Sequence, residues 1–373
     1  MALRQQPLRL LADDLTGALD SAAAFASPSE PIPVCWRGKV PARGAIAIDS
    51  RSREASPEHA QALVRKIAPA LWPPGAGLAF KKVDSLLRGQ ETTELAAVLD
   101  LLRPTHCIIA PAFPAQQRTT RAGRQYAYSG DSCHIAPVDI AAELARAGHY
   151  VTLAKPGEGL PPGVSLWDAE SDADLDAVVA AAGDKEILWV GAGGLAAALA
   201  RAAGLERPAR SASLLYPVLG LIGSEHAVTR AQLTRLGPSH RQLEGANTED
   251  GEIRRRLAEH GVVFVTVHLP RGTERPIAAA HIEQIFAALL ASLDRPGTIV
   301  VAGGETLRGI CEALGADRLE VTGDIVPGVP CSTMRGGQWD ALAVVSKSGA
   351  FGGPDLLAEL VQGGPHARAG AAA

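Results

Sequence analysis

The feature that most constrains the fold is a repeated alternation of short apolar segments with segments of helical spacing. Strand-like runs at 8–12, 105–110 and 186–190 are each followed by a helical pattern of small and apolar residues. Strands that alternate with helices usually pair in parallel, because a parallel connection needs a crossover over one face of the sheet. We therefore predict an α/β protein with mainly parallel sheets flanked by helices.

The length and one internal break predict two domains. With 373 residues, 47% of them hydrophobic, the chain exceeds one ordinary domain and can fill two cores. The segment 207–210 has the composition of a linker, and a new alternation begins at Leu214. We predict domains over 1–210 and 211–373, each with its own sheet, and a disordered tail over 363–373.

Charge and hydropathy exclude several classes of partner. The net charge is −4, and no cluster of Lys and Arg with interleaved aromatic residues suggests nucleic-acid binding. No apolar segment is long enough to span a bilayer, and the N-terminus lacks the apolar core of a signal peptide. We expect a cytoplasmic protein that binds neither membrane nor nucleic acid. Five cysteines without a C-x-x-C pair argue against a structural zinc site.

Two adjacent carboxylates, Asp13 and Asp14, stand where the first strand ends and the first helix begins. In open α/β sheets this is the edge at which ligands bind. We predict that Thr16 caps the helix, so a pair of carboxylates is more than the cap requires. The competing interpretation is that one Asp serves only as a turn or capping residue.

A second dense set of polar residues follows the strand that begins at Leu78. Lys82, Asp84, Ser85 and Arg88 supply cations, a carboxylate and a hydroxyl, which suits recognition of a polyhydroxylated acid. The alternative for Lys82 and Asp84 is a surface ion pair. Arg118 follows a proline-rigidified loop after a further strand, and for the loop residues Arg51 and Arg53 a site wall and a solvated turn are equally supported.

The second domain contains glycine-rich turns at strand ends. The strand from Thr298 breaks at Gly303 and Gly304, where backbone N–H groups at a helix start could bind an anion. A constrained turn spans 323–330, and Lys347 enters a Ser- and Gly-rich turn suited to phosphate. Together these turns favour a nucleotide.

A weaker glycine motif lies in the first domain. Gly191, Gly193 and Ala196 match the G-x-G-x-x-A dinucleotide fingerprint, but no acidic residue follows at the distance needed to bind a ribose. We interpret these glycines as sites of close helix–strand packing, or at most as a rim of the first domain's site. An NAD-dependent sugar-acid dehydrogenase is the alternative that they would support.

In this order, the motifs resemble those of the four-carbon acid sugar kinase family. They are ADDLTGA from Ala12, K-x-D-S-x-L-R-G from Lys82, APAFP from Ala110 with RTT from Arg118, GAGGLA from Gly191, GGET from Gly303, PG-x-P from Pro327 and KSG-x-FG from Lys347. The resemblance implies a sugar-acid-binding N-terminal domain, a nucleotide-binding C-terminal domain and an active site in the interdomain cleft. It also implies ATP-dependent phosphorylation of the terminal hydroxyl of threonate, erythronate or a 3-oxo-tetronate, with ATP and Mg²⁺.

Residues and resemblance together define a candidate site whose metal ligands are not assigned. The catalytic candidates are Asp13, Asp14 and Asp84; the substrate-binding candidates are Lys82, Ser85, Arg88 and Arg118; the nucleotide-binding candidates are Ser224, Gly303, Gly304, Glu305, Thr306, Gly328, Lys347 and Gly349. The chain departs from the family pattern at Leu86, at Gln117 and over 223–226, and it is shortened near 126–137. A non-catalytic sugar-acid-binding relative is therefore a further alternative, and the sequence leaves a homodimer open.

Overall fold

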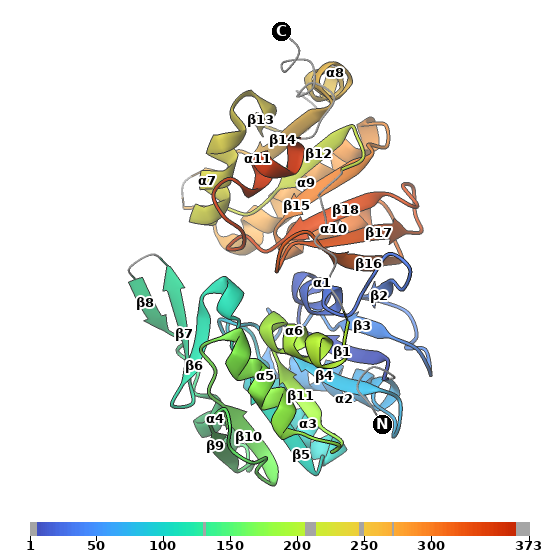
Figure 1. Cartoon of the computed structure of the whole chain (residues 1–373). Helices are drawn as coiled ribbons and strands as arrows, with labels where there is room; N and C mark the ends of the chain where they lie inside the picture. The colour runs from blue at the N-terminus through green and yellow to red at the C-terminus, as the bar shows by residue number, and fades with distance from the viewer. Residues whose placement is uncertain (1–5, 130–131, 206–213, 246–249, 271, 363–373) are drawn as a thin grey trace. The chain divides into compact units, whose positions relative to one another are not determined.

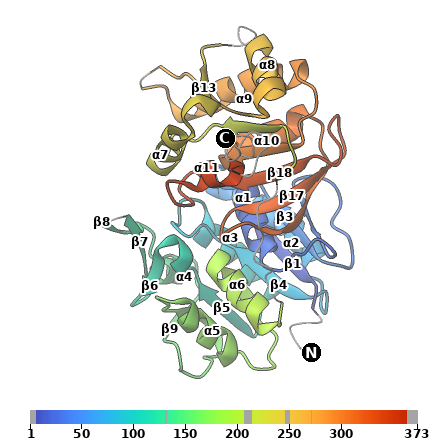
Figure 2. The ribbon, with the colours of Figure 1, turned by 45° about the horizontal axis from the view of Figure 1, so that its top comes forward.

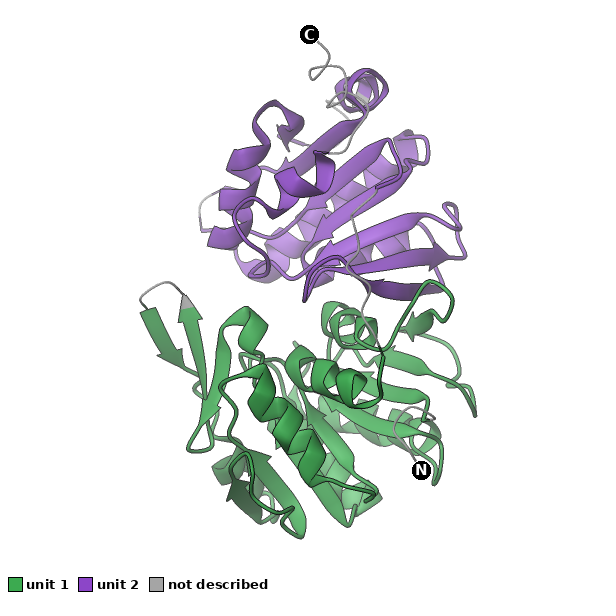
Figure 3. Ribbon diagram, in the orientation of Figure 1, with its two compact units in different colours: residues 1–208 green, residues 209–373 purple. Residues whose placement is uncertain are grey.

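The computed structural model describes residues 6–129, 132–205, 214–245, 250–270 and 272–362 (Figures 1 and 2). Its contacts divide the chain into unit 1, residues 1–208, and unit 2, residues 209–373 (Figure 3). The predicted linker at 207–210 and the predicted disordered tail at 363–373 lie outside the described residues.

Unit 1 is built on a parallel sheet with the strand order β2-β3-β1-β4-β11-β5-β10-β9. Its strands are β1 (Leu8–Ala12), β2 (Ile32–Cys35), β3 (Ile46–Asp49), β4 (Leu78–Lys82), β5 (His106–Ala110), β9 (Val151–Ala154), β10 (Gly163–Trp167) and β11 (Leu188–Gly191). The central strands are apolar and buried throughout, as expected for a sheet covered on both faces. Because the strands are parallel, all their carboxyl ends share one edge.

Six helices in the described part of unit 1 form two layers. They are α1 (Leu15–Ala23), α2 (Pro57–Leu71), α3 (Glu91–Leu102), α4 (Ile140–Arg146), α5 (Asp172–Ala181) and α6 (Gly193–Ala202). Helices α1, α5 and α6 pack together, as do α2, α3 and α4, and the two groups cover opposite faces of the sheet (Figures 1 and 2). Val64, Val98 and Leu144 belong to the same buried core as Leu11 and Ile109 of the sheet.

A small antiparallel sheet is attached to unit 1. It consists of β6 (Arg118–Arg121), β7 (Arg124–Ser129) and β8 (Ser132–Ile135), after a short 3-10 helix at Pro114–Gln116. Buried Gln125 connects this sheet to the loops that follow β4 and β5, since its amide donates to the carbonyl oxygens of Ser85 at 2.9 Å and Pro111 at 3.2 Å. The sequence does not predict these strands, because they are short and rich in polar residues.

Unit 2 contains a mixed sheet with the order β13-β14-β12-β15-β18-β17-β16, parallel as far as β18 and antiparallel beyond it. Its strands are β12 (Val218–Ile222), β13 (His240–Leu243), β14 (Val262–Val267), β15 (Thr298–Ala302), β16 (Arg318–Asp324), β17 (Pro330–Arg335) and β18 (Ala343–Lys347). Its helices are α7 (Ala227–Leu236), α8 (Asp250–His260), α9 (Arg275–Ser292), α10 (Gly304–Ala313) and α11 (Leu356–Val361), with a 3-10 turn at Gly237–Ser239. Helices α9 and α10 pack together, and so do α7 and α11.

The prediction of mainly parallel sheets flanked by helices is confirmed in each unit. The antiparallel pair β16 and β17 was missed, although the turn at 323–330 that joins them was predicted. Strand β16 is a half-buried strand with Arg318, Glu320 and Asp324 in it, which obscures its apolar alternation. Placement of the active site between the two units stays a prediction.

Candidate functional site

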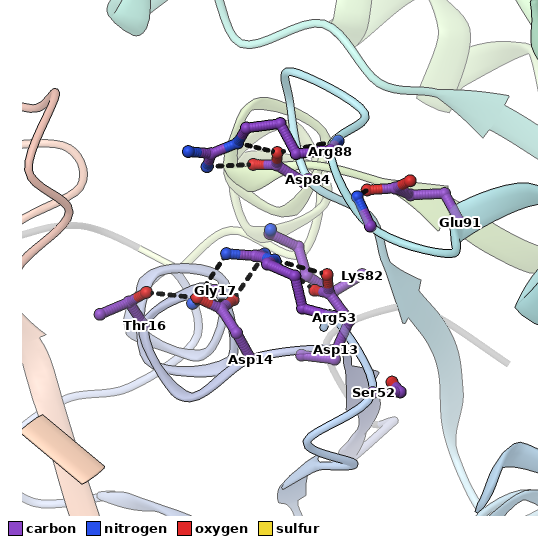
Figure 4. A network of polar contacts seen from close by, with 12 residues as sticks. Asp13, Asp14, Thr16, Gly17, Ser52, Arg53, Lys82, Asp84, Arg88 and Glu91 are labelled. Carbon is purple, nitrogen blue, oxygen red and sulfur yellow. Dashed lines mark hydrogen bonds and ion pairs between the residues drawn. The ribbon is translucent and has the colours of Figure 1, made fainter. Parts of the chain in front are cut away.

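The carboxyl edge of the unit 1 sheet gathers charged side chains from neighbouring strand ends (Figure 4). Asp13 and Asp14 follow β1, and Arg53 lies in the loop between β3 and α2. The Arg53 guanidinium donates from Nε to Asp13 Oδ2 and from Nη1 to Asp14 Oδ2, each at 2.7 Å. Its Nη2 donates to the second oxygen of each carboxylate, at 3.0 and 2.8 Å. One guanidinium therefore holds both carboxylates in place.

This arrangement keeps both sides of the pair charged although they are removed from water. Burial alone would raise the pKa of Asp13, but the charge and hydrogen bonds of Arg53, with Lys82 and Lys81, bring it below its usual range. Burial would likewise lower the pKa of Arg53, yet the charges of Asp13, Asp14 and Asp84 hold it well above its ordinary value.

Asp14, not Thr16, caps helix α1, so the prediction of a Thr16 cap is wrong. Asp14 has extended backbone angles, and its Oδ1 accepts from the backbone N–H of Gly17 at 2.9 Å. The Thr16 hydroxyl instead donates to Asp14 Oδ2 at 2.6 Å. The helix begins at Leu15, which places the residue before it, rather than the one after it, at the cap. Asp14 thus caps the helix and binds Arg53 at once.

Lys82 contributes a buried ammonium group beside these carboxylates. The side chain is 4% exposed and forms no hydrogen bond or ion pair with any residue that the structure describes. Its charge lowers the pKa of both Asp13 and Asp84. A Cβ on Gly17 would lie 2.8 Å from Lys82 Nζ and 2.5 Å from Asp14 Oδ1, so only glycine leaves room for these groups. A buried cation without a bonded partner is suited to bind an anionic ligand.

Asp84 and Arg88 form a second charge pair in the loop after β4. Arg88 donates from Nε and Nη2 to the two oxygens of Asp84, at 2.5 and 3.0 Å. Burial would raise the pKa of Asp84, but the Arg88 hydrogen bonds and the charges of Arg53, Arg88 and Lys82 hold it below its usual range. Asp84 is buried and bonded to Arg88, so the alternative of a Lys82–Asp84 surface pair is wrong. Ser85 is also buried in this loop.

Arg118 lies within electrostatic range of this second pair. Burial lowers its pKa, and the charge of Asp84 acts against that shift. Its Nη1 donates to the carbonyl oxygens of Gln117 at 3.1 Å and Tyr128 at 3.2 Å, whereas its buried Nε has no hydrogen-bond partner among the described residues. The small sheet thereby brings Arg118 to the candidate substrate site.

Two residues of this network were underrated or missed from the sequence. Arg53 was given equal weight as a site residue and as a solvated loop residue, yet it is the centre of the network. Glu91, the first residue of α3, was not considered. It is buried, and its Oε1 accepts from the Gly89 N–H at 2.9 Å. The sequence feature that indicates a site role for Glu91 is its position directly after the Arg88-Gly89-Gln90 turn.

In unit 2, glycine-rich turns meet at the ends of the neighbouring strands β12, β15 and β18. The Gly223 N–H donates to the Ala302 carbonyl and the Gly303 N–H to the Lys347 carbonyl, each at 3.1 Å. A Cβ on Gly223 would overlap the Thr306 hydroxyl, and one on Gly349 would overlap the Ser224 hydroxyl. Gly303 has φ +115°, a conformation that other residues rarely adopt. The glycines of these turns leave backbone without side chains at the start of α10, and we call this arrangement the cradle.

The remaining nucleotide-binding candidates differ in exposure. Gly328 lies in the β16–β17 turn with φ +84°, and Glu305 in the first turn of α10 is half-exposed, where it accepts from Arg275 at 3.3 Å. Lys347 is buried, and its Nζ donates to the Thr229 hydroxyl at 3.1 Å. Thr229 in turn donates to the Gly349 carbonyl at 2.7 Å. The Lys347 side chain thus supports the Gly349 turn from inside the unit.

The glycines of the dinucleotide-like segment have a packing role, as predicted. A Cβ on Gly191 would lie 2.5 Å from the Ala110 carbonyl oxygen, and one on Gly194 would lie 2.5 Å from the Ala112 carbonyl oxygen. Within the described residues, no group of three or more His, Cys, Asp and Glu side chains is arranged to hold a metal ion. In the same part of the chain, no helix has the length and apolar character needed to cross a bilayer.

Family models match both units. Residues 8–145 match the model described as a sugar-binding N-terminal domain, and residues 219–357 match the model described as a nucleotide-binding C-terminal domain. The site geometry and these matches define a class of protein that combines a sugar-binding domain with a nucleotide-binding domain. A crystal structure from Haemophilus influenzae has a related fold, with a TM-score of 0.68 at 21% identity over 95% of this chain and 99% of that chain.

Curated relatives make the assignment more specific. The D-threonate kinase of Bordetella bronchiseptica is 29% identical over 95% of this chain and 96% of its own length. The D-threonate kinase of Cupriavidus necator is 30% identical over 93% of this chain and 95% of its own length. The D-erythronate kinase of Heliobacterium modesticaldum is 25% identical over 94% of this chain and 95% of its own length. The chain belongs to the four-carbon acid sugar kinase family, whose members are phosphotransferases.

Proposed function

We propose that this protein is an ATP-dependent kinase that phosphorylates the terminal hydroxyl of a four-carbon sugar acid such as threonate, erythronate or a 3-oxo-tetronate. The observation that carries the proposal is the buried ammonium of Lys82, unbonded among the described residues and set beside two arginine-paired carboxylates. The names of the curated relatives support the choice of acids.

The site offers separate groups for the two ends of such an acid. Lys82 is positioned to bind the substrate carboxylate, with Arg88 and Arg118 as further cations. Asp13, Asp14 and Asp84 are acceptors for hydroxyl groups. Because arginine hydrogen bonds keep Asp13 and Asp84 ionised, they are weak bases that orient a hydroxyl. Phosphoryl transfer through a loose transition state needs mainly such positioning and charge neutralisation.

The cradle in unit 2 fits the phosphates of ATP. Gly223, Gly303 and Gly349 leave backbone close to the start of α10, where free N–H groups and the helix dipole favour an anion. Ser224 and Thr306 add hydroxyl groups at the same place. We infer that Mg²⁺ arrives bound to the nucleotide phosphates, which are oxygen ligands of the kind that this ion prefers.

The test is a coupled assay of ADP release with Mg²⁺, ATP and a panel of D- and L-threonate, D- and L-erythronate and their 3-oxo forms. Phosphorus NMR of the product then assigns the phosphorylated oxygen. Asp14→Asn and Arg88→Ala should each lower turnover at least tenfold, whereas Arg146→Ala, in an exposed pair on α4, serves as the control. ADP release that no acid of the panel stimulates, or binding of NAD in preference to ADP, would overturn the proposal.

A further inference from the structure

Glu91 is a buried carboxyl group that the proposed reaction does not use. The residue is 4% exposed, and its Oε1 accepts from the Gly89 N–H at 2.9 Å. Its Oε2 is buried without a hydrogen-bond partner among the described residues. A charged oxygen in such a place loses its hydration without compensation, whereas a protonated carboxyl group tolerates it.

Charged groups from all the neighbouring loops surround this carboxyl. A Cβ on Gly89 would lie 3.3 Å from Glu91 Oε1, 2.9 Å from Asp13 Oδ2 and 3.5 Å from Arg53 Cγ, so little space separates the three side chains. Figure 4 shows Glu91 in the same cluster as Asp84 and Arg88. Burial, with the charges of Asp13 and Asp84, raises the pKa of Glu91 to about 7, against the opposing Gly89 hydrogen bond.

The cations of the site leave no counterion for Glu91. Arg53 is bonded to Asp13 and Asp14, and Arg88 is bonded to Asp84. One helical turn along α3, Lys81 is paired with Glu94 at 2.6 Å. Lys82 forms no bond with Glu91 among the described residues, and Arg118 donates to the carbonyl oxygens of Gln117 and Tyr128. An ionised Glu91 would add a negative charge where an anionic substrate has to bind.

We propose, on the basis of the proposed function, that Glu91 is a positioning residue that takes up a proton when the sugar acid binds. The proton comes from solvent and is held on Oε2, and no other bond changes. An incoming carboxylate adds a negative charge to the cluster, which favours the protonated form of Glu91. Glu91 thereby restricts acid binding at alkaline pH without contacting the acid itself.

The test is calorimetric titration of the full chain with D-threonate in the absence of nucleotide, in buffers of different ionisation enthalpy. We expect uptake of up to about half a proton per acid bound at pH 7, and an affinity that falls by up to about tenfold per pH unit at higher pH. Glu91→Gln, which mimics the protonated form, should bind the acid at pH 6 as the wild type does, without proton uptake or this pH dependence.

The outcomes separate the role of Glu91 from the proposed function. Binding without proton uptake by the wild type, or uptake that persists in Glu91→Gln, would overturn the role of Glu91 alone. Binding of none of the four-carbon acids would overturn the proposed function and this role with it. If Glu91→Gln does not fold, the wild-type proton count measured from pH 6 to 8.5 still decides, because uptake must peak where Glu91 titrates.

Discussion

At the scale of single residues, the site depends on charges that only their immediate partners make tolerable. Asp13 is 2% exposed, and Arg53 compensates its burial with two hydrogen bonds. The bidentate geometry of the guanidinium suits this task, since a lysine presents one charge without a planar pair of donors. Removal of the arginine therefore leaves two carboxylates close together and unpaired.

Arg53→Ala should destabilise the protein as well as inactivate it. Removing one partner of a buried ion pair typically costs about 3 to 5 kcal/mol, because the remaining charge stays out of water. We expect a loss of this size in the free energy of unfolding, measured by urea denaturation, and a partial recovery in Arg53→Lys. Arg146→Ala in an exposed pair should change stability by less than about 1 kcal/mol. Equal stabilities for Arg53→Ala and Arg146→Ala would contradict this account.

Gly17→Ala should affect ligand binding while leaving the fold intact. Gly17 has ordinary helical geometry, so alanine suits its backbone. The added methyl group must displace Lys82 Nζ or Asp14 Oδ1, both less than 3 Å away. We expect D-threonate affinity to fall at least tenfold, by calorimetry, while weakening of the Asp14 cap lowers the free energy of unfolding by no more than about 2 kcal/mol. Gly251→Ala, at an open helical position, is the control, and equal affinities in both variants would refute the role of Gly17.

At the scale of elements, the edge formed by the strand ends positions both candidate sites. This much follows from sequence, because apolar runs such as β12 and β15 end in Gly or Ser and are followed by helices. The role of Arg53 could not be derived, since it depends on the pairing of β3 with β1, which brings Arg53 to Asp13 across 40 residues of chain. The strands β6 to β8 are not predicted, because they are short and rich in polar residues, some of them buried, so no hydrophobic period marks them.

The burial of Lys347 at the end of β18 predicts a pH-dependent stability. Burial lowers the pKa of Lys347 to about 7 in the folded protein. In the unfolded chain a lysine has a pKa near 10.4. Between these two pH values the unfolded state therefore binds more protons than the folded state. The free energy of unfolding should therefore rise with pH from about 7 to about 10, by at most about 1.4 kcal/mol per unit.

Urea denaturation at several pH values, compared with Lys347→Met, measures this contribution. The difference between wild type and variant should grow in favour of the wild type as the pH increases. Lys185→Met, at an exposed position, should follow the wild type at every pH. If Lys347→Met shows the same pH dependence as the wild type, the lysine is charged in the folded state.

At the scale of the whole molecule, each unit contains its own set of ligand-binding candidates. Those of unit 1 are mainly charged side chains, which can distinguish one hydroxy acid from another. Those of unit 2 are mainly backbone groups and hydroxyls around glycines, which suit the phosphates that every ATP molecule shares. Substrate choice should therefore reside in unit 1.

This division predicts that a single substitution weakens the binding of one ligand and leaves the affinity for the other unchanged. Lys82→Met removes a charge-assisted contact of about 1.5 to 3 kcal/mol, so D-threonate affinity should fall at least tenfold while ADP affinity stays within twofold. Gly349→Ala places a methyl group on the Ser224 hydroxyl and should give the reverse pattern. Both should lower kcat/KM at least tenfold, whereas Lys185→Met and Gly353→Ala, at exposed or open positions, should not. Calorimetry with each ligand alone measures the effect, and a variant that loses both ligands while remaining folded would contradict the assignment of one ligand to each unit.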